Sequence, residues 1–140
     1  MTLEEEIRCE RECTRLSNDF AFAVDRGHFD DFIALFAPDG ALERRGEVLR
    51  GPQALRGFLE AMPKNRTMRH ICTNIRIDMT SPTSAKGTSS TLMMHVMADA
   101  GTPLPMKAAT PLCAEYEDEY VLTGSGWKFK YRNTIIVFQP

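Results

Sequence analysis

The sequence predicts an α+β fold in which helices come first and strands follow. Residues 3–26 contain no proline or glycine, and their apolar side chains recur at three- and four-residue steps, which is typical of an amphipathic helix. From residue 67 onward the pattern changes to that of successive strands. This order favours helices packed on one face of a curved antiparallel sheet.

Two shorter helices are expected after the first, which ends at Gly27. The spacing of aromatic side chains predicts a helix over 28–36, and Pro38-Asp39-Gly40 then predicts a turn. A strand pair is expected over 41–49. Pro52 stands in the first turn of a third helix that extends to about residue 61.

Four strands account for most of the remaining chain. They are expected over 67–79, 85–98, 111–123 and 126–138, and the Gly124-Ser125-Gly126 stretch predicts a tight hairpin between the last two. Three prolines and a glycine in 99–111 predict a long connection that cannot extend the sheet. We expect this connection to lie over the open end of the fold as a lid or rim, the alternative being an ordinary surface loop.

Length and charge exclude several classes of protein. A chain of 140 residues with 43% apolar residues fits one domain, 1–140, with one core. The formal net charge is −2 and the basic residues are dispersed, so no nucleic-acid partner is expected. No apolar run is long enough to span a membrane, and the acidic N-terminus does not resemble a signal peptide. A cytoplasmic location is therefore expected.

The four cysteines do not form a recognisable disulfide framework. Cys9 and Cys13 are one helical turn apart and supply at most half of a metal site, because no second pair of ligands accompanies them. We therefore expect no metal, and the reaction hypothesis below also expects no organic cofactor.

The stretch MRHICTN, residues 68–74, is unusual for a strand. With a period of two it places His70, Cys72 and Asn74 on one face. A solvated face usually carries Lys, Glu or Thr, and a core face is usually aliphatic. Imidazole, thiol and amide groups in one row suit the wall of a pocket.

Two further residues could act with this row. Asp25 lies in the last turn of the first helix, where the helix dipole disfavours an anion; it is either a solvated carboxylate or a buried one that needs a donor such as a histidine. His95 shares a strand face with Met93 and Met97, a soft apolar lining for a flat organic ligand. A histidine satisfied in the core is the alternative for His70 and His95 alike.

The last strand offers an aromatic wall. With a period of two, Trp127, Phe129, Tyr131 and Asn133 share one face of this strand. Such a face lines a ligand pocket, or else forms plain sheet core or a dimer contact.

Several motifs together resemble a known family. FAFAVDRGHFDDFIALFAPDG at 20–40, RGPQALRGFL at 50–59, RHICTNIRI at 69–77 and GWKFKYR at 126–132 are similar to the SnoaL-like branch of the nuclear-transport-factor-2-like superfamily, which has a cystatin-like fold. The branch includes scytalone dehydratase-like and bile-acid dehydratase-like enzymes. The resemblance implies a cone in which three N-terminal helices close over a bent sheet around an apolar pocket, often in a dimer through the outer sheet face.

The resemblance also implies roles for individual residues. In dehydratase-like members an Asp near the end of the first helix pairs with a strand His, and the motifs place these at Asp25 and His70, with a second pocket histidine at His95. The tyrosines that polarise the substrate carbonyl in such enzymes are replaced here, because Phe20, Val24 and Arg44 occupy the candidate positions.

These observations lead to two functional hypotheses. The first is a lyase or isomerase that acts on a cyclic carbonyl compound, with His70 as general base and His95 or Tyr131 as hydrogen-bond donor. The second is a non-catalytic module that binds a small apolar or aromatic ligand or serves for dimerisation. An Asp25 carboxylate in contact with a His70 ring that faces an open cavity would favour the enzyme.

Overall fold

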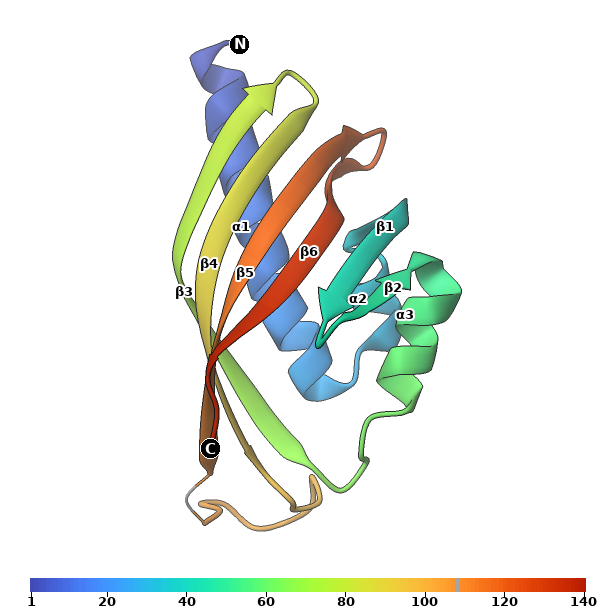
Figure 1. Cartoon of the computed structure of the whole chain (residues 1–140), viewed down its shortest axis with the longest axis vertical. Helices are drawn as coiled ribbons and strands as arrows, with labels where there is room; N and C mark the ends of the chain where they lie inside the picture. The colour runs from blue at the N-terminus through green and yellow to red at the C-terminus, as the bar shows by residue number, and fades with distance from the viewer. Residues whose placement is uncertain (108) are drawn as a thin grey trace.

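Figure 1 shows the computed structural model of the chain, which describes residues 1–107 and 109–140. The helices are α1 (Leu3–Arg26), α2 (Phe29–Ile33) and α3 (Gly51–Glu60). The strands are β1 (Phe36–Arg44), β2 (Glu47–Arg50), β3 (Thr67–Ser81), β4 (Ser84–Val96), β5 (Thr110–Thr123) and β6 (Gly126–Phe138). The predicted α+β class is confirmed. Residue 108, inside the expected 99–111 connection, lies outside the described residues.

The six strands form one bent sheet in the order β2-β1-β6-β5-β4-β3. Neighbours are antiparallel, as expected, except for the parallel pair of β1 and β6. Hairpins fix the direction of β3 to β6, whereas β1 comes from the N-terminal half and joins the sheet after α2, so no hairpin sets its direction relative to β6. The helices cover one face, with α1 crossing behind the long strands (Figure 1).

Helix α1 has clear start and stop signals. Thr2 and Glu5 form a capping box, and Gly27 ends the helix with a left-handed φ of 70°. Its buried stripe includes Leu16, Phe20 and Val24, which pack against the concave face of the sheet. The long helix predicted over 3–26 is confirmed. No helix in the described ranges is long and apolar enough to cross a membrane.

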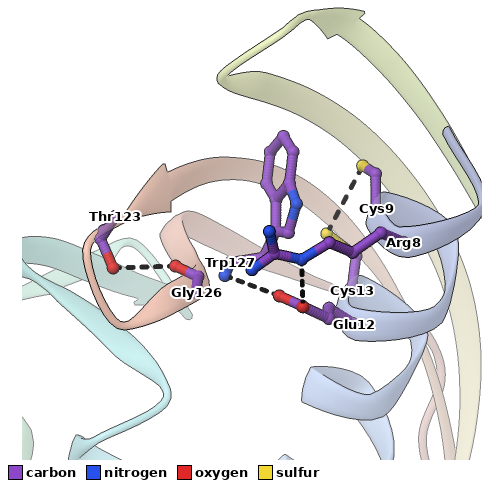
Figure 2. Close-up of polar contacts among 7 residues, drawn as sticks. All are labelled: Arg8, Cys9, Glu12, Cys13, Thr123, Gly126 and Trp127. Atoms are coloured by element: carbon purple, nitrogen blue, oxygen red, sulfur yellow. Dashed lines mark hydrogen bonds and ion pairs between the residues drawn. The ribbon is translucent and has the colours of Figure 1, made fainter. Parts of the chain in front are cut away.

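The first half of α1 is fastened to the hairpin between β5 and β6. Figure 2 shows the Glu12 carboxylate accepting hydrogen bonds from the Arg8 side chain, at 2.7 Å, and from the backbone N–H of Trp127, at 3.1 Å. Cys9 and Cys13 are fully buried beside this contact, with their sulfur atoms 4.0 Å apart. No group of three metal-ligating side chains was found among the described residues.

The second helix is shorter than predicted. It ends at Ile33, and Pro38-Asp39-Gly40 lies within β1 at a break in register and not in a free turn. Gly40 lies in the strand because β1 approaches β6 closely there: a Cβ on Gly40 would lie 2.7 Å from the backbone oxygen of Phe129. A glycine is needed for that approach.

Two irregularities change which face the strands present. In β3, Asn74 and Ile75 together oppose one residue of β4, and Asn74 has a φ of 53°. In β6, Lys130 is an extra residue, because Phe129 pairs with Tyr120 and Tyr131 pairs with Glu119. Such bulges reverse the alternation of side chains beyond them.

Candidate active site

Asp25 and His70 form a direct pair at the end of α1. The Asp25 Oδ1 atom lies 2.5 Å from Nδ1 of His70, and Oδ2 accepts a hydrogen bond of 2.7 Å from the His70 backbone N–H. Side-chain exposure is 3% for Asp25 and 14% for His70, so the pair is shielded from bulk solvent. The carboxylate therefore fixes both the backbone and the ring of the same residue.

The fold explains why this pair forms. β3 is an edge strand, so the His70 N–H that points away from β4 has no partner within the sheet. The last turn of α1 brings Asp25 to that edge. Two hydrogen bonds to the carboxylate offset both its burial and the unfavourable helix dipole at this position.

The His70 ring faces a cavity of about 300 Å³ between the helices and the sheet. Apolar side chains from α1, β1, α3 and the long strands form most of its wall, with polar groups interspersed. The lining residues are Phe20, Val24, Phe32, Leu42, Arg44, Arg45, Phe58, Met62, Arg66, Met68, His70, Thr91, Met93, His95, Leu112, Ala114, Tyr116, Thr134 and Ile136. Asp25 does not line this cavity and supports His70 from behind.

Several polar groups are available to a ligand in the cavity. Nδ1 of His95 and the hydroxyl of Thr91 are buried and have no hydrogen-bond partner among the described residues. Burial raises the pKa of Tyr116 to about 12, so its phenol stays protonated and can donate a hydrogen bond. These groups provide donors within the same cavity as the His70 ring.

The structure gathers part of the predicted pocket around His70. Phe20, Val24, Met93 and His95 all line the cavity with it. His70 is paired in register with Met93, and Met68 with His95, so the two histidines lie diagonally on neighbouring strands.

Three other predicted pocket residues do not line the cavity. Cys72 is half-buried and is not among the lining residues, and burial raises the pKa of its thiol. Asn74 is exposed at the β3 bulge, so the predicted row of three side chains ends at Cys72. Met97 follows the end of β4 and is 58% exposed.

The predicted common face of the last strand is wrong beyond the bulge. Trp127 and Phe129 do point inward, but Trp127 packs beside the start of α1 and Phe129 is completely buried in the core. Tyr131 points outward and donates a hydrogen bond to Glu43. The extra residue in β6 is the cause, since it places Arg132 on the inner face instead.

Arg132 and Asp118 form a second buried pair, which the sequence did not reveal. Two nitrogens of Arg132 contact the Asp118 carboxylate at 2.8 and 2.9 Å, and the guanidinium also donates to the Ser17 hydroxyl at 2.7 Å. The Tyr120 hydroxyl donates to the same carboxylate. Aromatic rings cover the cation, including that of Tyr116 at 3.8 Å.

Tyr116 was missed as a site residue although a signal for it exists. The strand sequence AEYEDEY alternates, and its inward positions are Ala114, Tyr116, Asp118 and Tyr120. A period-two analysis of β5 would have placed Tyr116 on the cavity wall. No comparable signal was available for Arg132, because a bulge precedes it.

The connection after β4 does not cover this cavity. None of the described residues between Val96 and Thr110 lines it, and Leu104 is 82% exposed. The described residues of this segment form a surface loop below the strand ends (Figure 1), which corrects the expectation of a lid.

A larger depression of about 530 Å³ lies on the outer face of the sheet. Its wall mixes exposed acids and bases such as Asp78, Lys86 and Glu119. None of the described residues that line it is a histidine, so it has no counterpart of the Asp25–His70 contact. We therefore place the candidate active site on the concave side.

Comparison with known proteins identifies the class. The model for the SnoaL-like domain matches residues 5–133, and the chain belongs to this family. Its fold is that of the nuclear-transport-factor-2-like superfamily. No curated protein matches the sequence significantly.

Three solved structures illustrate the likeness in fold. A provisionally named scytalone dehydratase from Novosphingobium aromaticivorans is 24% identical with a TM-score of 0.84, over 99% of this chain and 91% of that one. Rv3472, a Mycobacterium tuberculosis protein of unknown function whose structure is that of a single-residue variant, is 22% identical with a TM-score of 0.76. The match covers 89% of this chain and 69% of that one. The hexachlorocyclohexane dehydrochlorinase LinA-type3 from Novosphingobium barchaimii is 19% identical with a TM-score of 0.75, over 94% and 91%.

Proposed function

We propose that the protein is a lyase or isomerase that acts on a cyclic, carbonyl-bearing organic molecule through Asp25–His70 acid–base chemistry. The contact of 2.5 Å between Asp25 Oδ1 and His70 Nδ1, with the ring facing a cavity of about 300 Å³, carries this proposal. Two of the similar solved structures are named as a dehydratase and a dehydrochlorinase, and these names are consistent with elimination chemistry.

His70 acts as the general base in this proposal. Asp25 accepts the Nδ1–H, which leaves Nε2 without a proton and directed at the substrate. Nε2 removes a proton α to the carbonyl, and the electron pair of the C–H bond moves to the carbonyl oxygen to form an enolate. Tyr116 or His95 donates a hydrogen bond to that oxygen as charge develops.

The next step decides between the two reaction types. If the substrate carries a β-hydroxyl, the enolate electrons form a carbon–carbon double bond as hydroxide leaves and takes the proton from His70 as water. If the proton returns to a different carbon, the product is an isomer. The buried hydroxyl of Thr91, which has no partner among the described residues, lies in the same wall and can bind a departing or retained hydroxyl.

The experiment is α-proton exchange of a tetralone in D₂O, followed by NMR. Replacement of His70 by Ala is expected to slow enzyme-promoted exchange by roughly 10²–10⁴-fold. His28→Ala is the matched control, because His28 is an exposed histidine outside the cavity. Equal exchange rates for the wild type and His70→Ala would contradict the role of the base and favour a pocket that only binds ligands.

We also propose that the protein is a homodimer through the outer face of the sheet. An apolar row crosses four strands there, since Ile71 pairs with Leu92, Leu92 with Cys113 and Cys113 with Phe138. Ile71 is 54% exposed and Phe138 is 70% exposed. Light scattering should give twice the mass of one chain for the wild type and the mass of one chain for Leu92→Lys. A monomeric wild type would refute the dimer.

A further inference from the structure

Three arginines line the cavity that contains His70. Arg44 comes from the end of β1, Arg45 from the turn after it, and Arg66 from the residues before β3. None of the lining residues is Asp or Glu. The cavity wall therefore carries positive charge that the wall itself does not neutralise.

Arg44 is held in place without an acidic partner. Its guanidinium carbon lies 4.9 Å from the centre of the Phe58 ring, which fixes the side chain against α3. No carboxylate oxygen lies within 4.0 Å of it in the described part of the chain. Burial lowers the pKa of Arg44, and the charge of Arg45 lowers it further; the charge of Glu47 partly opposes this, and Arg66 adds a smaller lowering effect.

Arg66 is also short of partners. Its Nε atom is buried and has no hydrogen-bond partner among the described residues. One terminal nitrogen approaches the sulfur of Met68 at 3.7 Å, a weak acceptor for a cation. Two half-buried guanidinium groups on one cavity wall, neither of them in an ion pair with a described residue, are costly unless an anion joins them.

We propose that the ring-bearing substrate carries a carboxylate, which Arg44 and Arg66 bind while its ketone lies beside His70. The inference deepens the proposed function and rests on it. The planar guanidinium fork matches a carboxylate with paired hydrogen bonds, and the low exposure of the wall strengthens that attraction. The anion anchors one end of the molecule, so the arginines determine which ketones are presented to the base.

Binding of naphthoate and naphthamide tests this proposal, because the two probes share a ring system and differ in charge. Calorimetry on the wild-type protein should show naphthoate binding roughly 10- to 100-fold more tightly than naphthamide. Arg44→Gln and Arg66→Gln should each remove most of this preference and leave naphthamide binding unchanged. Arg69→Gln is the matched control, because Arg69 lies next to Met68 but is exposed and lies outside the cavity wall.

Two further measurements keep the result interpretable. Circular dichroism establishes that each variant is folded, and Arg44→Lys, which retains charge without the planar fork, should show an intermediate preference. His70→Ala should keep the full preference for naphthoate, because the base does not bind the anion. If His70→Ala loses proton-exchange activity but still prefers naphthoate to naphthamide, then catalysis and anion binding depend on different residues. The two proposals can therefore fail separately. A wild-type protein that binds naphthoate no more tightly than naphthamide would overturn the carboxylate assignment.

Discussion

The protein contains two buried acid–base pairs that differ in what surrounds them. Asp118 and Arg132 are 1% and 0% exposed, and a serine, a tyrosine and several aromatic rings enclose them. Asp25 is equally well covered at 3%, but the ring of its partner His70 is 14% exposed and faces a cavity. The first pair is closed on all sides, whereas the second leaves a ring nitrogen available to a ligand.

This difference separates a structural role from a chemical one. A buried ion pair whose charges are held together within the protein stabilises a particular packing of the core, although Nη1 of Arg132 has no hydrogen-bond partner among the described residues. A histidine with one nitrogen held by a carboxylate and the other directed at a cavity has the arrangement of a general base. Burial alone does not distinguish the two pairs. They differ in that a cavity lies beside His70, whereas packed side chains surround Arg132.

The largest expected effect is on stability, at the closed pair. Asp118→Ala leaves the Arg132 cation buried without a counter-charge, and we expect the free energy of unfolding to fall by about 3–5 kcal/mol. Denaturant titration measures this change. Glu117→Ala is the control, because Glu117 is an exposed acid on the same strand. A loss below about 1 kcal/mol, the usual range of an exposed pair, would contradict the structural role.

Tyr116 lies at the boundary between the two regions, and its hydroxyl can be removed separately from its ring. The ring of Tyr116→Phe can still cover Arg132, so stability at neutral pH should change little. Loss of the hydroxyl should slow tetralone exchange on the order of 10²-fold if it stabilises the enolate. Exchange kinetics measure the expected loss of rate, and thermal unfolding measures whether stability is unchanged. An unchanged exchange rate would leave His95 as the donor.

A smaller effect concerns alkaline stability. Burial, partly opposed by the charge of Arg132, raises the pKa of Tyr116 to about 12, whereas an unfolded tyrosine has a pKa near 10. The folded state thus keeps this proton when the unfolded state loses it. Its contribution to stability is complete below pH 10 and is lost as pH rises through about 12.

The wild type should therefore lose about 1.4 kcal/mol more than Tyr116→Phe between neutral pH and pH 11. Denaturant titrations of both proteins at several pH values measure the difference. Parallel curves for the two proteins would show that the Tyr116 phenol is not desolvated in the folded state.

The regular parts of this fold could be predicted because local patterns determine them. The end of α1 at Gly27 and the period of two around His70 and His95 each depend on neighbouring residues alone. The Asp25–His70 contact followed from the family motifs. The spatial contact itself joins residues that are 45 positions apart and depends on how α1 crosses the edge strand.

The errors have a common physical origin. Single extra residues in β3 and β6 change the faces of the strands, so Asn74 and Tyr131 do not line the predicted pocket and Arg132 lies on the inner face of the sheet. A bulge depends on register with the neighbouring strand, which a period of two does not encode. Arg44 was noted only as a replacement for a tyrosine, and Arg66 was not noted, because their shared cavity depends on the placement of α3 and β1.

The role of His70 as the base is tested most directly by the position of the proton on its ring, read from ¹⁵N chemical shifts of the ligand-free protein. We predict that Nδ1 carries the proton donated to Asp25 and that Nε2 carries none. In Asp25→Asn the side-chain amide can donate to Nδ1, so the proton should move to Nε2 and exchange activity should fall. Protonation of Nε2 in the wild type would contradict the claim that His70 is the base.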